Sequence, residues 1–391
     1  MNQREELELF NRWWFDDAWH KTDKHISKWQ THEIKWLPEW LKQISLEPFS
    51  LNFVIGPRQV GKTTGIKLLI KQLIEKGVSE EKIVYFDVGL VPTIESFKKL
   101  LSSLRNYEFI FLDEVTSVND WWKVLRAYVD SGIFKDCVIV VTASASIRIK
   151  KHAELFPGRT GKGKIVEVIP LSFPQLVKVL YGSKKAESSK LRKAFRIYTK
   201  FGGFPLSINE GDNAITELIK SVEGEMAKLD LSIETASKII CSLMSKIPSA
   251  LSYQSIAGDI GISYKTVEYY LEKLKGLYIL NTAYWKHNEK ISFRKEKKIF
   301  FRDPFIYHAF SFWTGTKFLE SALFEGIVQE HLLRKFGEIY YFKNSYEIDC
   351  IAGDLKVEVK AGKPHRKYPR NVKVLDEEDL PRFLLELFFR S

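Results

Sequence analysis

A glycine-rich loop at residues 56–63 constrains the fold of this chain more than any other feature. It reads GPRQVGKT and matches the pattern GxxxxGK[ST], in which glycines let consecutive backbone N–H groups turn inward around a phosphate. An apolar run precedes the loop and a helix-like run follows it, as the pattern requires. A chance glycine-rich turn is the alternative, but it would leave the Lys-Thr pair unexplained. The sequence therefore predicts a phosphate-binding loop formed by Gly56, Pro57, Arg58, Gln59, Val60, Gly61, Lys62, Thr63 and Thr64.

Five short apolar runs between residues 51 and 170 are separated by stretches with helical patterning. Continuous apolar runs of this length are typical of strands buried on both faces, which occur in parallel sheets covered by helices. The sequence therefore predicts an α/β fold with a parallel sheet, whose five strands we expect at residues 51–56, 82–88, 108–114, 137–144 and 164–170.

Two carboxylates, Asp113 and Glu114, end the third of these runs. In a nucleotide-hydrolysing site, Asp113 would hold the hydrated Mg²⁺ and Glu114 would polarise the attacking water as general base. Lys62 would neutralise the β- and γ-phosphates, and the hydroxyl of Thr63 would ligate the Mg²⁺. A purely structural interpretation, in which the acidic pair only terminates a strand, does not account for the phosphate loop upstream.

The fourth run ends in VVTASAS, which places Thr142 and Ser144 where a polar residue commonly senses the γ-phosphate. Hydroxyl side chains at strand ends also act simply as turn formers. Arg159, in a glycine-rich loop, is a candidate arginine finger that would reach the nucleotide of a neighbouring subunit. That role would require a homo-oligomer, which one arginine does not establish.

Several of these motifs occur together in one known family. GPRQVGKTT, the run FIFLDE, the loop FPGRTGKG, the following PLSF and the later GGFP resemble, in this order, AAA+ superfamily ATPases fused to a C-terminal domain. The resemblance covers most of residues 50–360 and implies ATP binding and ATP hydrolysis. Ala143 departs from the pattern, because the family more often has glycine after the sensor threonine.

We expect four parts along the chain. Residues 1–45 form an aromatic-rich helical segment that packs on a neighbour, and residues 46–230 form the ATPase domain with a helical lid broken by GGFP. Residues 231–300 form a winged-helix module, and residues 301–391 form a small restriction-endonuclease-like α/β domain.

Residues 251–280 have the spacing of a helix-turn-helix, with Gly261 in the turn and Ser263 as the cap of the second helix. The run YILNTAYW that follows would supply the wing. In the alternative, the module docks a protein or belongs to the ATPase lid. In a DNA-binding version, the residues facing the major groove would be Ser263, Tyr264, Lys265, Thr266 and Tyr269.

Two short strands between Tyr346 and Lys360 are expected to form a hairpin over a Gly-Asp turn. Alternation along the second strand points Glu358 and Lys360 to one face, near Asp349, and Glu325 on an upstream helix could complete a site. Carboxylates can hold Mg²⁺, and Lys360 can orient the water that attacks a phosphodiester. The arrangement resembles the PD-(D/E)xK nuclease core. The alternatives are a hairpin with solvated charges and a nuclease-like fold that only binds DNA.

The charge balance favours a polyanionic partner, for which we expect DNA. The chain has 60 Lys and Arg against 49 Asp and Glu, giving a net charge of +11. The alternative is a basic protein whose charge serves only solubility. Beside the hairpin, a basic rim fits phosphate contacts and consists of Lys356, Lys363, Arg366, Lys367, Arg370 and Lys373.

The remaining composition points to the cytoplasm. Three widely spaced cysteines fit neither a disulfide framework nor a zinc site. No apolar run approaches the roughly 20 residues of a membrane span, and the start of the chain lacks the apolar core of a signal peptide. We therefore expect ATP-dependent action on DNA, with a metal-dependent cut at the C-terminal hairpin as a further expectation. The rivals are a signalling switch with an inactive tail and an ATPase that remodels protein partners.

Overall fold

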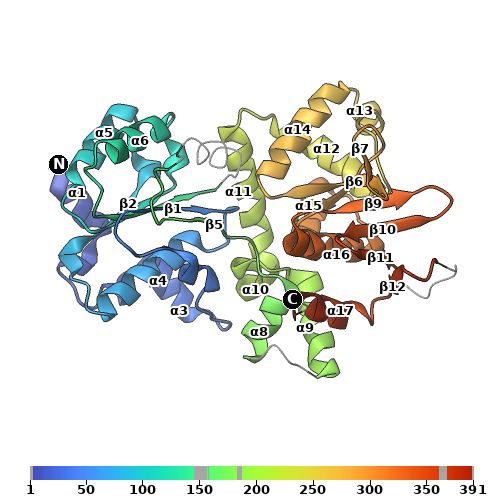
Figure 1. Cartoon of the computed structure of the whole chain (residues 1–391), viewed down its shortest axis with the longest axis horizontal. Coiled ribbons are helices and arrows are strands. Elements are labelled where there is room, and N and C mark those ends of the chain that lie inside the picture. Colours follow the sequence, from blue (N-terminus) through green and yellow to red (C-terminus); the bar gives the residue numbers. More distant parts are fainter. Residues whose placement is uncertain (1–2, 145–155, 157, 183–186, 361–367, 390–391) are drawn as a thin grey trace. The chain divides into compact units, whose positions relative to one another are not determined.

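The computed structural model describes residues 3–144, 156, 158–182, 187–360 and 368–389 (Figure 1). The chain divides into two compact units, Met1–Ile169 and Pro170–Ser391. Residues 170–230, which we expected to form the lid of the ATPase domain, belong to the second unit, and the four-part division stays a prediction. In the described ranges, no helix has the length and apolar character that crossing a bilayer requires. All three cysteines are free thiols.

The first unit is built on a five-stranded parallel sheet with the order β2-β3-β4-β1-β5. Every residue of β1 and β4 is buried, because helices cover both faces. This confirms the predicted α/β sheet. The strands are β1 (Ser50–Ile55), β2 (Ile83–Asp87), β3 (Phe109–Asp113), β4 (Val138–Ala143) and β5 (Ile165–Glu167).

Helices cover the two faces of this sheet unequally. In Figure 1, α4 (Lys62–Glu75) lies on one side, and α5 (Ile94–Ser103) and α6 (Trp121–Asp130) lie on the other. The right-handed rule for crossovers explains this arrangement. The chain first crosses from β1 to the edge strand β2 and then returns through β3 to β4, so the direction of the crossover reverses after α4.

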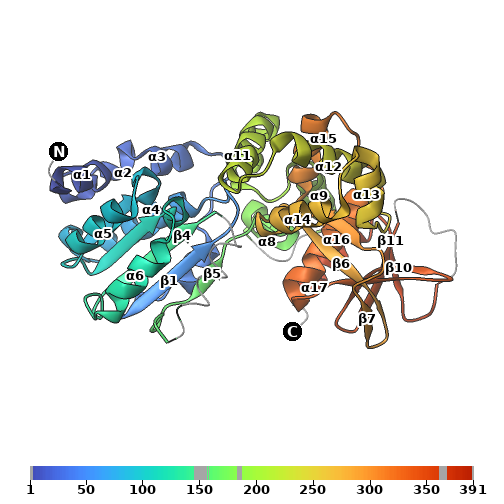
Figure 2. The same cartoon turned by 90° about the horizontal axis from the view of Figure 1, so that it is seen from above.

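The N-terminal segment closes the edge of the sheet at β2. It forms α1 (Gln3–Phe10), α2 (Trp19–Thr22) and α3 (Lys24–Thr31), which follow one another along the first unit in Figure 2. The side chain of Asn11 accepts from the N–H of Tyr85 at 2.7 Å and donates to its carbonyl at 2.9 Å. The indoles of Trp13 and Trp14 donate to the carbonyl of Ile83. As expected, the segment packs on a neighbour, and it also protects an exposed strand edge.

The second unit begins with a helical layer in which GGFP forms a tight turn. Gly202 has φ +61°, and a Cβ on Gly203 would lie 1.9 Å from the carbonyl oxygen of Leu171. The N–H of Gly203 donates to Asp303 at 2.9 Å. The turn interrupts the helical stretch at the predicted residues, and it is close-packed. The helices are α8 (Phe173–Tyr181), α9 (Ser188–Phe201), α10 (Pro205–Glu210), α11 (Ala214–Lys228) and α12 (Ile233–Lys246).

Two helices joined by a short turn occupy the residues predicted for the helix-turn-helix. They are α13 (Tyr253–Ile260) and α14 (Tyr264–Gly276). Gly261 in the turn has φ +69°, and the hydroxyl of Ser263 accepts from the N–H of Thr266 at 3.1 Å. The strands that follow are β6 (Leu280–His287), β7 (Lys290–Ser292) and β8 (Lys298–Phe301), and β6 pairs antiparallel with the other two.

Strand β6 also belongs to the C-terminal sheet, whose order is β12-β11-β10-β9-β6-β7. The predicted boundary at residue 300 therefore falls inside β8 and beside a continuous sheet. The predicted hairpin is present, with Gly353 at φ +52° in its turn, while β9 and β12 were not predicted. The elements are α15 (Pro304–Thr314), α16 (Glu320–Phe336), β9 (Tyr340–Lys343), β10 (Glu347–Ala352), β11 (Leu355–Val359), β12 (Lys373–Leu375) and α17 (Leu380–Phe389).

Candidate nucleotide site and C-terminal carboxylate cluster

The loop at residues 56–63 connects β1 to α4, which begins at Lys62. Gln59 and Gly61 have φ of +64° and +84°, a left-handed region that residues other than glycine rarely enter. A Cβ on Gly56 would lie 1.8 Å from the carbonyl oxygen of Val168, so that this position accommodates only glycine. A loop with this conformation at the start of a helix can direct several N–H groups at one anion.

Lys62 is folded onto the loop that precedes it. Its ammonium donates to the carbonyl oxygens of Gly56 and Pro57, each at 2.7 Å. The side chain is 7% exposed. The positive charge is therefore held at the loop and does not extend into solvent.

Three hydroxyl groups donate hydrogen bonds to Asp113. The hydroxyl of Thr63 donates to Oδ2 of Asp113 at 2.6 Å, and the phenol of Tyr85 donates to the same oxygen at 2.9 Å. The hydroxyl of Thr142 donates to Oδ1. Because β3 lies between β2 and β4, the ends of these strands bring Tyr85 and Thr142 to Asp113 from either side. The hydroxyl and carboxylate oxygens of Thr63 and Asp113 are the kind of donor that Mg²⁺ prefers, so these residues fit that ion.

Glu114 directly follows β3 in a left-handed conformation, with φ +55°. Its N–H donates to the hydroxyl of Thr142 at 3.0 Å, and its carboxylate accepts from the hydroxyl of Ser144 at 2.7 Å. Arg58 of the phosphate loop lies 4.0 Å from the same carboxylate. The structure thus brings together the residues predicted at the ends of β1, β3 and β4. The left-handed backbone at Glu114 turns the chain away from the direction of β3.

Tyr85 and Lys67 lie behind this site and were not predicted. The ammonium of Lys67 lies 3.7 Å from the centre of the Tyr85 ring and 3.7 Å from Asp23. Burial lowers the pKa of Lys67 to about 8, against the opposing effect of Asp23 and Asp113. Burial and the negative charge of Asp113 raise the pKa of the Tyr85 phenol well above its ordinary value, so the phenol stays protonated and donates.

Arg159, the candidate arginine finger, is held within its own unit. Its Nε lies 2.5 Å from Oδ1 of Asp130, at the end of α6. The arginine is therefore placed by an ion pair in the first unit, and a role at the nucleotide of a neighbouring subunit stays a prediction.

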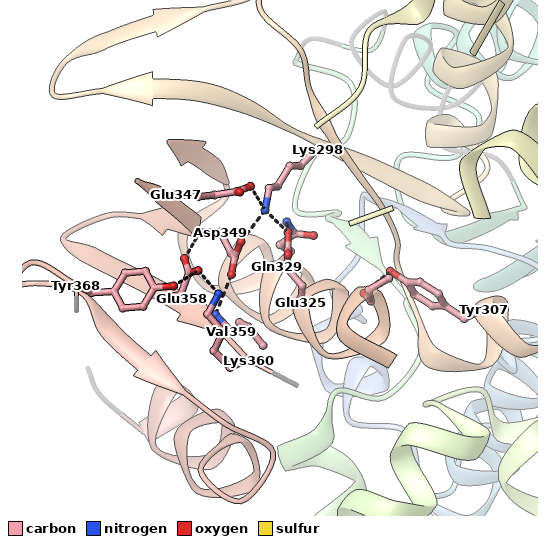
Figure 3. Close-up of polar contacts among 11 residues, drawn as sticks. Lys298, Tyr307, Glu325, Gln329, Glu347, Asp349, Glu358, Val359, Lys360 and Tyr368 are labelled. Carbon is pink, nitrogen blue, oxygen red and sulfur yellow. Dashed lines mark hydrogen bonds and ion pairs between the residues drawn. The ribbon is translucent and has the colours of Figure 1, made fainter. Parts of the chain in front are cut away.

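A second cluster of ionisable side chains lies in the C-terminal sheet (Figure 3). At its centre is Lys298, which was not predicted. The ammonium of Lys298 donates to Asp349 at 2.7 Å and to Glu325 at 2.9 Å, and it lies 2.9 Å from Glu347. Burial by itself lowers the pKa of this lysine. The carboxylates of Glu325, Asp349 and Glu347 outweigh that effect and hold the pKa well above its ordinary value.

Glu358 and Lys360 lie at the other side of Asp349. Glu358 accepts from the ammonium of Lys360 at 2.5 Å, from the phenol of Tyr368 at 3.0 Å and from the N–H of Asp349 at 3.2 Å. Burial, with a contribution from Asp349, raises the pKa of Glu358. The hairpin therefore brings Asp349, Glu358 and Lys360 together, as predicted, and Tyr368 is an additional member. Lys363, Arg366 and Lys367 of the predicted basic rim lie outside the described residues.

The predicted metal site at Glu325, Asp349 and Glu358 is not formed as expected. In the described parts of the chain, no group of three or more His, Cys, Asp or Glu side chains is arranged to hold a metal ion. Lys298 lies between Glu325 and Asp349, whereas Glu358 is occupied by Lys360 and Tyr368. A buried lysine on a distant strand gives no local signal in the sequence, which is why the contacts of Lys298 were not anticipated.

Comparisons with known proteins identify the first part of the chain most clearly. Residues 49–177 match the family model of the AAA domain, and residues 192–317 match that of a domain of unknown function. The chain therefore contains an AAA ATPase-like domain, as the motifs implied, while neither match supports a nuclease-like tail. An uncharacterized protein of Methanocaldococcus jannaschii is 24% identical over 337 residues, covering 79% of this chain and 73% of its own length.

Solved structures overlap with the chain only loosely. RuvB of Thermotoga maritima is 14% identical, with a TM-score of 0.34, over 59% of this chain and 81% of its own. The ORC2 protein of Aeropyrum pernix, in a complex with ADPNP and ADP, is 13% identical. Its TM-score is 0.37, over 69% of this chain and 90% of its own.

Proposed function

We propose that the chain binds and hydrolyses ATP at the ends of β1, β3 and β4 and uses this reaction to act on DNA. The observation that carries the first half of the proposal is one hydrogen-bond network next to a glycine-rich loop that begins a helix. In it, the hydroxyls of Thr63 and Thr142 donate to Asp113, and the N–H of Glu114 donates to Thr142. This set supplies an anion cradle, an Mg²⁺ ligand pair and a base within one network.

Each residue of this set has a chemical role in the proposal. The loop N–H groups and Lys62 would hold the β- and γ-phosphates, and Thr63 and Asp113 would hold Mg²⁺, which would neutralise the phosphate charge. Glu114 would take the proton of the attacking water. Thr142 would keep Asp113 and the backbone of Glu114 in place, since it hydrogen-bonds to both. We also propose that Arg159 acts at the nucleotide of a second copy of the chain.

The exposed surface of the second unit supports the DNA half of the proposal. On α14, Tyr264 and Tyr269 are 45% and 49% exposed, and Lys265 is also exposed. Aromatic and basic side chains at the start of a second helix suit a winged helix that reads a DNA groove. A groove of about 600 Å³ along α9 is lined by four cations, Arg192, Lys193, Arg196 and Lys200. Such a surface suits the phosphate backbone of DNA.

Two rival functions differ from this proposal in how ATP turnover responds to DNA. A nucleotide-dependent switch or a protein-remodelling ATPase would use the same nucleotide site, but DNA would not change its turnover. Cleavage of DNA by the C-terminal cluster is not part of this proposal, because Lys298 lies where the metal was expected.

The variant Lys62→Ala tests the nucleotide site. We expect ATP turnover to fall by about 10²-fold or more, because the charge that meets the β- and γ-phosphates is lost. Phosphate release by the purified full chain, measured with and without Mg²⁺, gives the readout. Lys71→Ala on the same helix is the matched control, since Lys71 pairs only with Glu75 on the surface, and should hydrolyse ATP normally. Unchanged turnover in Lys62→Ala would refute the site.

A further inference from the structure

The C-terminal carboxylate cluster contains a cation of its own. We infer that the ammonium of Lys298 permanently occupies the position between Glu325, Glu347 and Asp349 and that this cluster therefore takes up no divalent metal ion. The cluster is then an ion network that joins β8, α16 and β10, and it does not cut phosphodiesters. The inference is independent of the proposed ATPase, because it concerns only residues of the second unit.

Three carboxylates surround the ammonium of Lys298, two of them as hydrogen-bond acceptors and the third as an ion-pair partner. An ammonium has three N–H donors and no acceptor. Asp349, Glu325 and Glu347 lie at 2.7, 2.9 and 2.9 Å from the nitrogen. A metal ion at the same point would meet the ammonium instead of an open set of oxygens.

The carboxylate oxygens are also committed to other partners. Oε1 of Glu325, which accepts from Lys298, also accepts from the side-chain amide of Gln329 at 2.9 Å, and the second oxygen of Asp349 accepts from the N–H of Val359 at 2.9 Å. Mg²⁺ requires near-octahedral oxygen ligands and usually keeps several of its waters. A cluster in which an ammonium already lies against all three carboxylates, and in which Glu325 and Asp349 are buried, does not offer that geometry.

Burial and strand pairing hold Lys298 in the cluster. Its side chain is 2% exposed, those of Glu325 and Asp349 are 5% and 8% exposed, and that of Glu347 at the rim is 33% exposed. Its backbone begins β8, where Lys298 pairs with Ala283 of β6. Leaving the carboxylates would require the ammonium to be buried without partners or the strand to shift, and an unpaired buried charge is strongly unfavourable.

Mn²⁺ binding to the full chain tests the inference directly. The chain carries Asp113→Asn, so that the proposed nucleotide-site metal does not contribute, and free Mn²⁺ is measured by electron paramagnetic resonance. We expect that adding Asp349→Asn or, separately, Glu358→Gln leaves the number of bound Mn²⁺ ions unchanged. If either substitution removes a bound Mn²⁺ from a folded chain, the cluster is a metal site and the inference fails.

The variant Lys298→Met tests whether the lysine is what excludes the metal. Without its ammonium the cluster keeps its carboxylates, so we expect the variant to gain about one Mn²⁺ per chain, and Mn²⁺ to raise its melting temperature. Lys297→Met is the matched control, because it removes the same charge one residue away, where the side chain lies over the ring of Tyr253. Equal Mn²⁺ binding by the two variants would overturn the role of Lys298. Should Lys298→Met not fold, the comparison with Asp349→Asn and Glu358→Gln still decides the inference.

Discussion

Lys67 shows how a single buried charge links the N-terminal segment to the candidate nucleotide site. It lies on α4, and its ammonium contacts the ring of Tyr85, the carboxylate of Asp23 and the carbonyl of Phe10. Tyr85 in turn donates to Asp113. The side chain therefore supports the acidic residue of the site from behind, at the cost of burying a positive charge.

This cost makes stability depend on pH in a defined direction. The pKa of Lys67 is lowered to about 8, so between pH 8 and 10.5 the unfolded chain binds more protons than the folded one. Stability should therefore rise with pH across this window, by about 3 kcal/mol relative to a chain without the lysine. We expect the difference in free energy of unfolding between the natural chain and Lys67→Met to show this rise.

Tryptophan fluorescence during urea unfolding can follow this effect, because eight of the ten tryptophans lie at or before residue 122, in the first unit. Lys71→Met, on the surface of the same helix, should give curves that run parallel to the natural chain from pH 7 to 10.5. If Lys67→Met also runs parallel, the ammonium is not destabilised by burial.

At the scale of residues, the sequence predicts what is encoded locally. Lys62, Thr63, Asp113 and Glu114 stand in short motifs at strand ends, and the parallel sheet brings them together as expected. Tyr85 and Lys298 could not be found in this way, because their roles depend on strand order and on burial. Lys298 is 51 residues from Asp349, and no pattern in the sequence connects the two.

Helix α9 has a cationic surface that fits a polyanionic partner. Its buried face consists of Leu191, Ala194, Phe195 and Tyr198, and its other face carries the cations that line the groove. The helix contains no acidic residue, so its charges are not balanced along its own length. Such a stripe at helical spacing follows a polyanion by contacts to successive phosphates.

Charge reversal on this helix tests the proposed DNA contact. We expect Arg192→Glu/Arg196→Glu to weaken duplex DNA binding by about tenfold or more near 0.1 M salt, and to reduce the slope of log affinity against log salt by about two. Fluorescence anisotropy with labelled DNA gives both quantities. The matched control, Lys220→Glu/Lys317→Glu, changes the net charge equally at exposed positions outside the groove. Equal weakening by both pairs would mean that only net charge matters.

At the scale of elements, prediction succeeded where periodicity was strong. The five strands of the parallel sheet and the two helices around Gly261 lie at the predicted residues, because apolar runs and caps mark them in the sequence. The short strands β9 and β12 were missed, since three or four residues carry too little pattern. The GGFP break between α9 and α10 lies at the predicted residues, whereas its contact with the distant Asp303, which accepts from the N–H of Gly203, could not be predicted.

At the scale of the whole molecule, the division of the chain was the hardest property to predict. Strand β6 pairs with β8 and also with β9, so the expected winged-helix and nuclease-like parts share one sheet. Linkers rich in proline or glycine would have marked a boundary, but a strand that serves two neighbours leaves no such mark. The chain leaves the first unit between Ile169 and Pro170, directly after β5.

That exit is attached to the strand that carries the phosphate loop. Strand β5 pairs with β1, and the N–H of Val168 donates to the carbonyl of Ile55 at 2.7 Å, one residue before Gly56. A change in the conformation of the phosphate loop would therefore be transmitted to the segment that continues into the second unit. We propose that this connection is the route by which DNA bound to α9 or α14 alters ATP turnover.

DNA-stimulated hydrolysis tests this coupling. We expect duplex DNA to raise ATP turnover severalfold at low salt, and salt to abolish the stimulation, because phosphate contacts weaken steeply as salt rises. The variant Arg192→Glu/Arg196→Glu should keep its basal turnover, since neither arginine lies in the first unit, and should lose most of the stimulation. Turnover that ignores duplex, branched and single-stranded DNA alike would favour a switch or a protein-remodelling ATPase. Stimulation that survives the charge reversal would instead move the DNA contact from α9 to another surface, of which the exposed face of α14 is the next to substitute.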